Sequence, residues 1–277
     1  MKIISSIDEL RDARASLPGP FGLVPTMGYL HAGHVSLAVR AKAECASVIV
    51  SIFVNPTQFG PNEDLAKYPR DLPRDLAQLE AVGVDLVWTP TTEIMYPPGF
   101  QTWVTVEELT SPLEGVQRPD HFRGVTTVVT KLFNAVQPKK AYFGQKDAQQ
   151  TAVIRRMTKD LDFPIEIVVC PTVREVDGLA MSSRNIYLSL EERKAATVLQ
   201  SALCAAKVLY ETGERDAEML RGVIRSMINN EPLARLQYVS CADYDTLGEL
   251  GTVTGKILLS MAVFIGKTRL IDNFVLE

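Results

Sequence analysis

The chain has 277 residues, of which 46% are hydrophobic and 22% are charged, which suits one large globular domain or two small ones. Its formal net charge of -4 provides no overall basic surface and argues against nucleic acid as a partner. The longest apolar stretch, residues 257–265, is too short to cross a bilayer as a helix, so no membrane partner is expected either.

The cysteines and the N-terminal residues indicate a cytoplasmic protein. The four cysteines are far apart, lie in apolar neighbourhoods and form no Cys-x-x-Cys pair, which favours buried free thiols in a reducing compartment. Charged residues occur too early in residues 1–10 for a secretory signal.

Strand-like and helix-like segments alternate through the first 170 residues. The predicted strands are 21–24, 48–54, 84–88, 141–143 and 165–170, with an alternating, edge-like run at 102–106; the predicted helices are 35–43, 72–82, 125–136 and 148–161. Residues 55–62 are predicted to be a loop from their Pro, Gly and Asn content. Regular alternation predicts a Rossmann-like, doubly wound parallel sheet.

The pattern changes after Pro171. A loop at 173–185 is followed by a long helix from the N-cap Ser189 to about residue 210, and by a second helix at 217–228. Three strand-like runs follow, at 236–241, 256–265 and 270–276. We therefore predict two domains, a Rossmann-like domain at 1–172 and a smaller α+β lid domain at 173–277.

The turn at residues 25–34 is the first candidate site. It joins a predicted buried strand to a predicted helix through glycines, and it carries His31 and His34, two of the three histidines. Backbone N–H groups and the positive end of a helix dipole converge at such a turn, which makes it an anion site.

Three interpretations of this turn stay open on spacing alone. A metal site needs a third ligand, and the only other histidine is His121. A helix-capping role needs no chemistry. A nucleotide site would use the histidines to stabilise charge at an attacked α-phosphate, and His31-Ala32-Gly33-His34 resembles the His-x-Gly-His signature of nucleotidyltransferases.

Three further segments carry candidate side chains. Gly144-Gln145-Lys146-Asp147 follows a predicted strand, so Lys146 is either a solvated surface residue or a phosphate ligand. Met181-Ser182-Ser183-Arg184 offers hydroxyls and a guanidinium that suit pyrophosphate, although Ser-Ser-Arg alone is a weak motif. The amides of Asn55 and Gln58 either orient a hydroxylated substrate or only shape a turn.

Together these motifs, in this order and at these spacings, resemble the pantothenate synthetase (pantoate–β-alanine ligase) family. The resemblance runs from the first predicted strand to Ile271-Asp272-Asn273 and rests on five motifs: Pro25-Thr26-Met27-Gly28 with His31-Ala32-Gly33-His34, Val54-Asn55-Pro56-Thr57-Gln58-Phe59, His121-Phe122-Arg123-Gly124, Gly144-Gln145-Lys146-Asp147-Ala148-Gln149-Gln150, and Ser182-Ser183-Arg184-Asn185.

The resemblance implies an ATP-dependent ligase that makes pantoyl adenylate and then the amide with β-alanine, releasing pyrophosphate and AMP. It implies His34 as the catalytic histidine, with His31, Lys146 and Arg184 beside it in the chemistry. The residues it implies for ATP binding are Met27, Gly28, Tyr29, Leu30, His31, Ala32, Gly33, His34, Gly144, Gln145, Lys146, Asp147, Val173, Met181, Ser182, Ser183 and Arg184. For pantoate it implies Gln58 and Gln150, with Asn55 in the same segment.

The resemblance also implies Mg²⁺ held mainly through the ATP phosphates, no metal site made by the protein alone, and a homodimer. Gln145 stands where the family commonly has Glu, and ATP binding is expected to survive this difference. Two rival functions remain: another nucleotidyltransferase, which leaves Gln58, Gln150 and the Ser-Ser-Arg segment unexplained, and a nucleotide-binding module without catalysis, against which both histidines and Lys146 argue.

Overall fold

The computed structural model describes residues 1–61 and 63–277 and divides into two compact units. Unit 1 comprises residues 1–144 and 150–171, and unit 2 comprises residues 145–149 and 172–277. The short segment 145–149 thus groups with unit 2 although both of its chain neighbours belong to unit 1.

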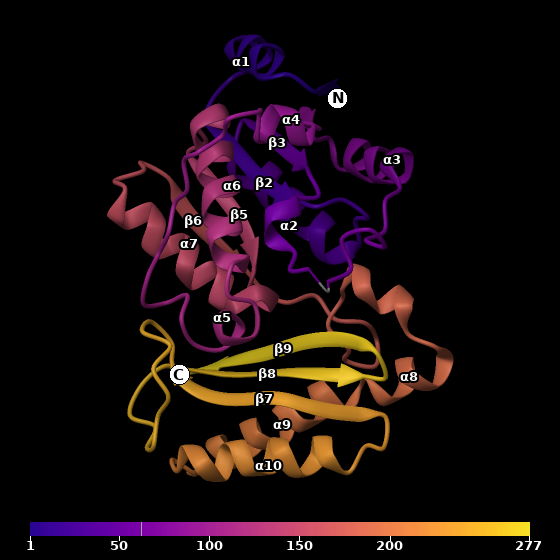
Figure 1. Ribbon diagram of the computed structural model, residues 1–277, viewed down its shortest axis with the longest axis vertical. Coiled ribbons are helices and arrows are strands. Elements are labelled where there is room, and N and C mark those ends of the chain that lie inside the picture. The colour runs from indigo at the N-terminus through magenta and orange to yellow at the C-terminus, as the bar shows by residue number, and fades with distance from the viewer. Residues whose placement is uncertain (62) are drawn as a thin grey trace. The chain divides into compact units, whose positions relative to one another are not determined.

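Unit 1 is built on a six-stranded parallel sheet (Figure 1). The strand order is β1-β4-β3-β2-β5-β6, with bounds β1 Lys2–Ile4, β2 Phe21–Thr26, β3 Ser47–Ile52, β4 Leu86–Trp88, β5 Lys140–Gly144 and β6 Glu166–Cys170. The chain passes from β2 outward through β3 to β4 and then crosses to β5 on the other side of β2. The order of the strands therefore reverses between β2 and β5, which is where ligands bind in open parallel sheets.

Helices cover both faces of this sheet. Successive residues of a strand point to opposite faces, so adjacent residues belong to two different cores. Leu23 of β2 and Ile49 of β3 pack on one core with α1 (Ile7–Ser16), α6 (His121–Val136) and α7 (Ala148–Asp160). Val24 and Val50 pack on the other core with α2 (Ala32–Glu44) and α3 (Leu72–Val82). The predicted doubly wound fold is confirmed.

Unit 2 is an antiparallel sheet of β7 (Ala234–Asp243), β8 (Ile257–Ile265) and β9 (Thr268–Leu276), in that order (Figure 1). One face of the sheet packs on α9 (Val198–Glu211) and α10 (Ala217–Asn229) through an apolar core that includes Leu203, Leu220 and Leu259. The predicted α+β character of this part of the chain is confirmed. The shorter elements of both units are α4 (Thr92–Met95), α5 (Glu114–Gln117), α8 (Leu190–Ala195), η1 (Pro56–Gln58), η2 (Gln145–Asp147) and η3 (Ser183–Tyr187).

Two predicted elements are wrong. The run 102–106 is not a strand, because its backbone bonds to side chains of α6: Val104 N–H donates to Thr127 Oγ1 (3.0 Å), and Thr126 Oγ1 donates to Val104 O (2.6 Å). The long helix predicted after Ser189 is instead two helices, α8 and α9. At the break Thr197 N–H donates to the carbonyl of Lys194 (3.2 Å), a tighter turn than that of an α-helix, and the Thr197 hydroxyl donates to the same carbonyl (2.8 Å).

Strand β1 was not predicted, because it has three residues with only Ile4 buried and is too short to show a pattern. In the loop predicted at 55–62, residues 56–58 form the single turn η1, and Asn62 lies outside the described residues. No helix within the described ranges combines the length and apolar character needed to cross a membrane.

Gly124 tests the packing of α6 against η1. A Cβ at this position would lie 2.3 Å from the carbonyl oxygen of Thr57, a contact that side chains do not tolerate. We expect Gly124→Ala to lower the free energy of unfolding by about 1–3 kcal/mol, measured as a shift in the urea midpoint.

Gly222→Ala is the matched control for this substitution. Gly222 also lies inside a helix, α10, but a Cβ there would meet nothing within 4 Å. It is expected to leave stability unchanged or to raise it by up to about 1 kcal/mol. Equal effects of the two substitutions would contradict the packing argument.

Candidate active site

The loops that carry the candidate residues of unit 1 follow neighbouring parallel strands. The His31–His34 turn follows β2, the Asn55–Gln58 segment follows β3, and Gly144 ends β5. Since β3, β2 and β5 are adjacent and parallel, their carboxyl ends meet at one edge of the sheet.

The two histidines of the turn cap helix α2. His31 is the N-cap, and its Nδ1 accepts from Gly33 N–H (3.1 Å), while Nδ1 of His34 accepts from His31 N–H (3.4 Å). The ring centroids lie 4.0 Å apart. A neutral imidazole that accepts through Nδ1 carries its proton on Nε2, so both rings keep an N–H donor on the far side from the helix.

The capping interpretation and the anion-site interpretation therefore do not exclude each other. The backbone fixes the tautomer and the orientation of both rings, and the helix N-terminus lies beside them. Such an arrangement suits the oxygens of a phosphate.

A buried carboxylate holds the backbone of this turn. Gly28 and Tyr29 have left-handed φ values of +80° and +49°. Glycine adopts this conformation freely, but at Tyr29 it needs support from the surroundings. Asp75 of α3, only 1% exposed, supplies it by accepting from Tyr29 N–H and Leu30 N–H, each at 2.7 Å. Burial raises the pKa of the Asp75 carboxyl, and the two N–H bonds oppose that rise.

Asp75 is not among the predicted site residues, although its position in the sequence carries a signal. Asp75 lies four residues before Leu79 and therefore on the apolar face of α3, where a carboxylate needs a buried partner.

Asn55 orients Gln58. Its Nδ2 donates to Gln58 Oε1 (2.9 Å) and to the carbonyl of Gly124 (3.1 Å), and its Oδ1 accepts from Tyr96 Oη (2.9 Å). Asn55 is buried and is the N-cap of η1, so it belongs to the support of Gln58 within unit 1.

His121 and Arg118 both bind the backbone carbonyl of Gln58. Arg118 donates to the carbonyl of Gln58 (3.0 Å) and forms a bidentate pair with Glu63 (2.7 and 2.6 Å). His121 Nδ1 donates to the same Gln58 carbonyl (2.9 Å), and its Nε2 accepts from Arg118 (3.2 Å). These contacts give the His121-Phe122-Arg123-Gly124 motif a structural role that the sequence did not reveal.

Gln150 lies on α7, in unit 1, and within the described residues it makes no hydrogen bond to Gln58. The remaining predicted site residues belong to unit 2.

In unit 2, Lys146 lies in η2 between Gln145 and Asp147. Val173 and Met181 are joined by a hydrogen bond from Met181 N–H to Val173 O (3.0 Å). Ser182 is the N-cap of η3, and its hydroxyl accepts from Arg184 N–H (3.2 Å). The loop predicted at 173–185 thus ends in a capped 3₁₀ turn that holds the Ser-Ser-Arg segment.

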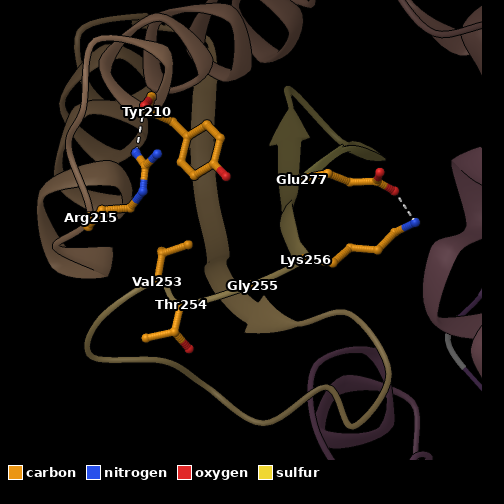
Figure 2. A pocket seen from close by; sticks show the side chains of 7 residues that line it. All are labelled: Tyr210, Arg215, Val253, Thr254, Gly255, Lys256 and Glu277. Carbon is orange, nitrogen blue, oxygen red and sulfur yellow. Dashed lines mark hydrogen bonds and ion pairs between the residues drawn. The ribbon is translucent and has the colours of Figure 1, made fainter.

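Unit 2 also has a surface pocket of about 560 Å³ that contains none of the predicted residues (Figure 2). It is lined by Tyr210, Arg215, Val253, Thr254, Gly255, Lys256 and Glu277. Arg215 donates to the carbonyl of Tyr210 and Lys256 pairs with Glu277, so both cations are engaged within the pocket wall (Figure 2). We assign it no function.

The described residues contain no group of three or more His, Cys, Asp or Glu side chains placed to hold a metal ion. His31 and His34 use their Nδ1 atoms on the backbone, and a third protein ligand is not within reach among the residues described.

His121 predicts a pH dependence of stability. Burial and the neighbouring Arg118 charge lower the pKa of His121 from 6.5 to about 4. Between these values the unfolded chain binds a proton that the folded chain does not, so stability falls as the pH is lowered. The loss on going from about pH 7 to about pH 4 is expected to approach 3 kcal/mol.

Urea unfolding of the wild type and of His121→Gln between about pH 7 and pH 4 measures this contribution. The variant lacks the titrating imidazole but keeps an N–H donor, and the ion pairs of Arg118 with Glu63 and Glu114 are present in both proteins. The variant is therefore expected to lose less stability toward low pH. Parallel pH profiles of the two proteins would show that His121 does not carry the effect.

Comparison with known proteins agrees with this geometry. The model of the family described as "Pantoate-beta-alanine ligase" matches residues 2–275. The pantothenate synthetase of Roseiflexus sp. (strain RS-1) is 64% identical over 277 residues, covering 100% of both chains. That of Herpetosiphon aurantiacus is 60% identical, also over 100% of both chains.

Solved structures give the same result. A crystal structure of pantothenate synthetase from Thermus thermophilus superposes with a TM-score of 0.95 at 48% identity, covering 99% of each chain. The pantoate–β-alanine ligase of Francisella tularensis, complexed with "Beta-gamma ATP" and β-alanine, superposes with a TM-score of 0.81 at 38% identity, over 99% of this chain and 97% of that one. Because the family match spans nearly all 277 residues, this chain belongs to the pantoate–β-alanine ligase family.

Proposed function

We propose that this chain joins pantoate to β-alanine in two ATP-dependent steps. A pantoate carboxylate oxygen attacks the α-phosphorus of ATP, the bond to the bridging oxygen breaks, and pyrophosphate leaves. The β-alanine amine then attacks the acyl carbon of pantoyl adenylate, loses a proton and displaces AMP. Family membership supports this reaction, and the observation that carries it is the pair of backbone-oriented imidazoles at the N-terminus of α2.

His34 and His31 are proposed to stabilise charge on the α-phosphate through their Nε2–H donors. Residues 27–34 contact ATP at the same turn. Gln58 and Gln150 hold pantoate, Gln58 also reaches β-alanine, and Asn55 keeps the Gln58 amide in place through the bond between them.

Unit 2 is proposed to supply the remaining ATP contacts, and its residues 173–277 are proposed to act as a lid. Lys146 and Arg184 neutralise charge on the phosphates, with Gln145, Asp147, Val173 and residues 181–183 around them and Gly144 at the end of β5. Acyl adenylates hydrolyse readily, so a lid that excludes water protects the intermediate. On this basis we assign residues 1–172 to the nucleotide and pantoate domain and residues 173–277 to the lid.

Mg²⁺ is proposed to accompany ATP. It would be held mainly by phosphate oxygens, which are the hard ligands that Mg²⁺ prefers. When bound, the ion neutralises charge on the phosphates. We also propose, from family membership, that the protein is a cytoplasmic homodimer.

ATP–pyrophosphate exchange without β-alanine tests the first step. Purified protein, Mg²⁺ and ATP are incubated with pantoate or with other small carboxylic acids. Exchange that depends on pantoate supports the proposal, and exchange with a different acid keeps the mechanism but changes the substrate. Binding of ATP without any exchange would favour a different transferase or a non-catalytic module.

Lys146→Ala is expected to slow adenylate formation by about 10²- to 10³-fold, because it removes one preorganised charge from the phosphate site. The measurement is pantoate-dependent pyrophosphate exchange. Lys159→Ala, at an exposed position in the last turn of α7, is the matched control and should exchange like the wild type. Near-normal exchange by the Lys146 variant would rule out its role.

Gln58→Ala is expected to raise the KM for pantoate by about tenfold or more while leaving ATP affinity unchanged, because the amide is proposed to contact pantoate and β-alanine but not ATP. Steady-state kinetics in each substrate measures the difference, and Gln101→Ala at an exposed position serves as the control. Weakened ATP binding with an unchanged KM for pantoate would contradict the assignment.

A further inference from the structure

The motif Ile271-Asp272-Asn273 belongs to β9, and the proposed chemistry does not use it. Yet Asp272 and Asn273 are both buried, at 2% and 4% exposure, and both carry polar side chains. Buried polar groups are costly unless they are hydrogen-bonded, so their partners indicate what they do.

Asn273 binds the turn that carries Lys146. Its Nδ2 donates to the carbonyl of Gln145 (3.1 Å) and to the carbonyl of Lys146 (2.9 Å). Its Oδ1 accepts from Nε2 of Gln145 (3.1 Å). One side chain thus binds the two peptide groups that flank the Cα of Lys146.

The neighbouring Asp272 forms hydrogen bonds that fix the position of β9 beside Asn273. It forms a bidentate pair with Arg174 (2.7 and 2.9 Å), and its Oδ1 also accepts from Asn273 N–H (2.8 Å). Arg174 in turn donates to Gly178 O (3.0 Å), in the turn between Val173 and Met181. Both segments of unit 2 that carry proposed ATP ligands are therefore bonded to adjacent residues of one strand.

These bonds also explain why residues 145–149 group with unit 2 although they connect β5 to α7 of unit 1. The side chain of Lys146 makes no ion pair or hydrogen bond within the described residues, so its own contacts do not place it. The placement comes from the backbone, and the backbone is bonded to Asn273.

We propose that Asn273 is a positioning residue that sets the place of Lys146 and thereby keeps the lysine in register with the Ser182–Arg184 segment on the same unit. The inference rests on the proposed role of Lys146 toward ATP. The Gln145 side chain fits this role, because its amide donates to the one oxygen of Asn273 that faces it, which a carboxylate at position 145 could not do.

A double-mutant cycle separates positioning from general structural support. We expect Asn273→Ala to weaken ATP binding, measured by calorimetry with MgATP, and to slow pantoate-dependent exchange, each by about tenfold to hundredfold. In the Lys146→Ala background the same substitution is expected to change either quantity by about twofold at most, because the group that it positions is gone.

Ser260→Ala is the matched control. Ser260 pairs directly with Asn273 in the register of β8 and β9, and its buried hydroxyl has no hydrogen-bond partner among the described residues. The control should bind ATP and exchange pyrophosphate within about twofold of the wild type.

Asn273→Asp is the second variant, to be used if Asn273→Ala is unfolded. It keeps the shape and the acceptor for Gln145 but removes both donors to the carbonyls, so it is expected to act in the same direction. Deuterium uptake of the peptide 145–149 should rise in either variant and stay unchanged in the control.

Equal losses in the wild-type and Lys146→Ala backgrounds, or unchanged ATP affinity in a folded Asn273 variant, would overturn the proposal. If the wild type shows no pyrophosphate exchange with any acid, the proposed function fails. The double-mutant cycle, measured by ATP affinity, still decides the role of Asn273. A wild type that does not bind ATP would overturn both.

Discussion

The buried carboxylate of Asp75 is the contact on which the candidate site depends. The turn after β2 can present two imidazoles and a helix N-terminus only if Gly28 and Tyr29 stay in a left-handed conformation. Two short hydrogen bonds from Tyr29 N–H and Leu30 N–H to one carboxylate impose that conformation. The packing of α3 fixes the position of this carboxylate, so the conformation of the turn depends on how α3 packs on the sheet.

Support of a turn by a polar side chain from elsewhere in the chain recurs at the other candidate segments. A polar side chain from a distant element binds backbone groups of a functional turn: half-buried His121 binds the carbonyl of Gln58, and buried Asn273 binds the carbonyls of Gln145 and Lys146. Each turn follows a strand, where the ladder of the sheet ends and backbone groups lose their partners. Side chains that satisfy those groups also set the direction of the residues that bind ligand.

Much of the architecture was predictable because it follows from local pattern. Continuous apolar runs predicted β3 and β6, periodic apolar positions predicted α6 and α10, and their alternation predicted the parallel sheet. The failures have local causes as well. Residues 102–106 alternate like a strand but bond to threonines of α6, and the chain after Ser189 tightens at Thr197 into a turn that separates α8 from α9. Hydrogen bonds of this kind leave no periodic signal in the sequence.

The sequence by itself determined the fold class, the family and the residue types of the candidate site, because these depend on hydrophobic pattern and on motifs that are contiguous in the chain. Only the tertiary structure decided which side chains support them. Asp75 lies 46 residues from Tyr29, His121 lies 63 from Gln58, and Asn273 lies 127 from Lys146. A hydrogen bond across such distances in the chain depends on packing between elements, and no spacing in the sequence encodes it.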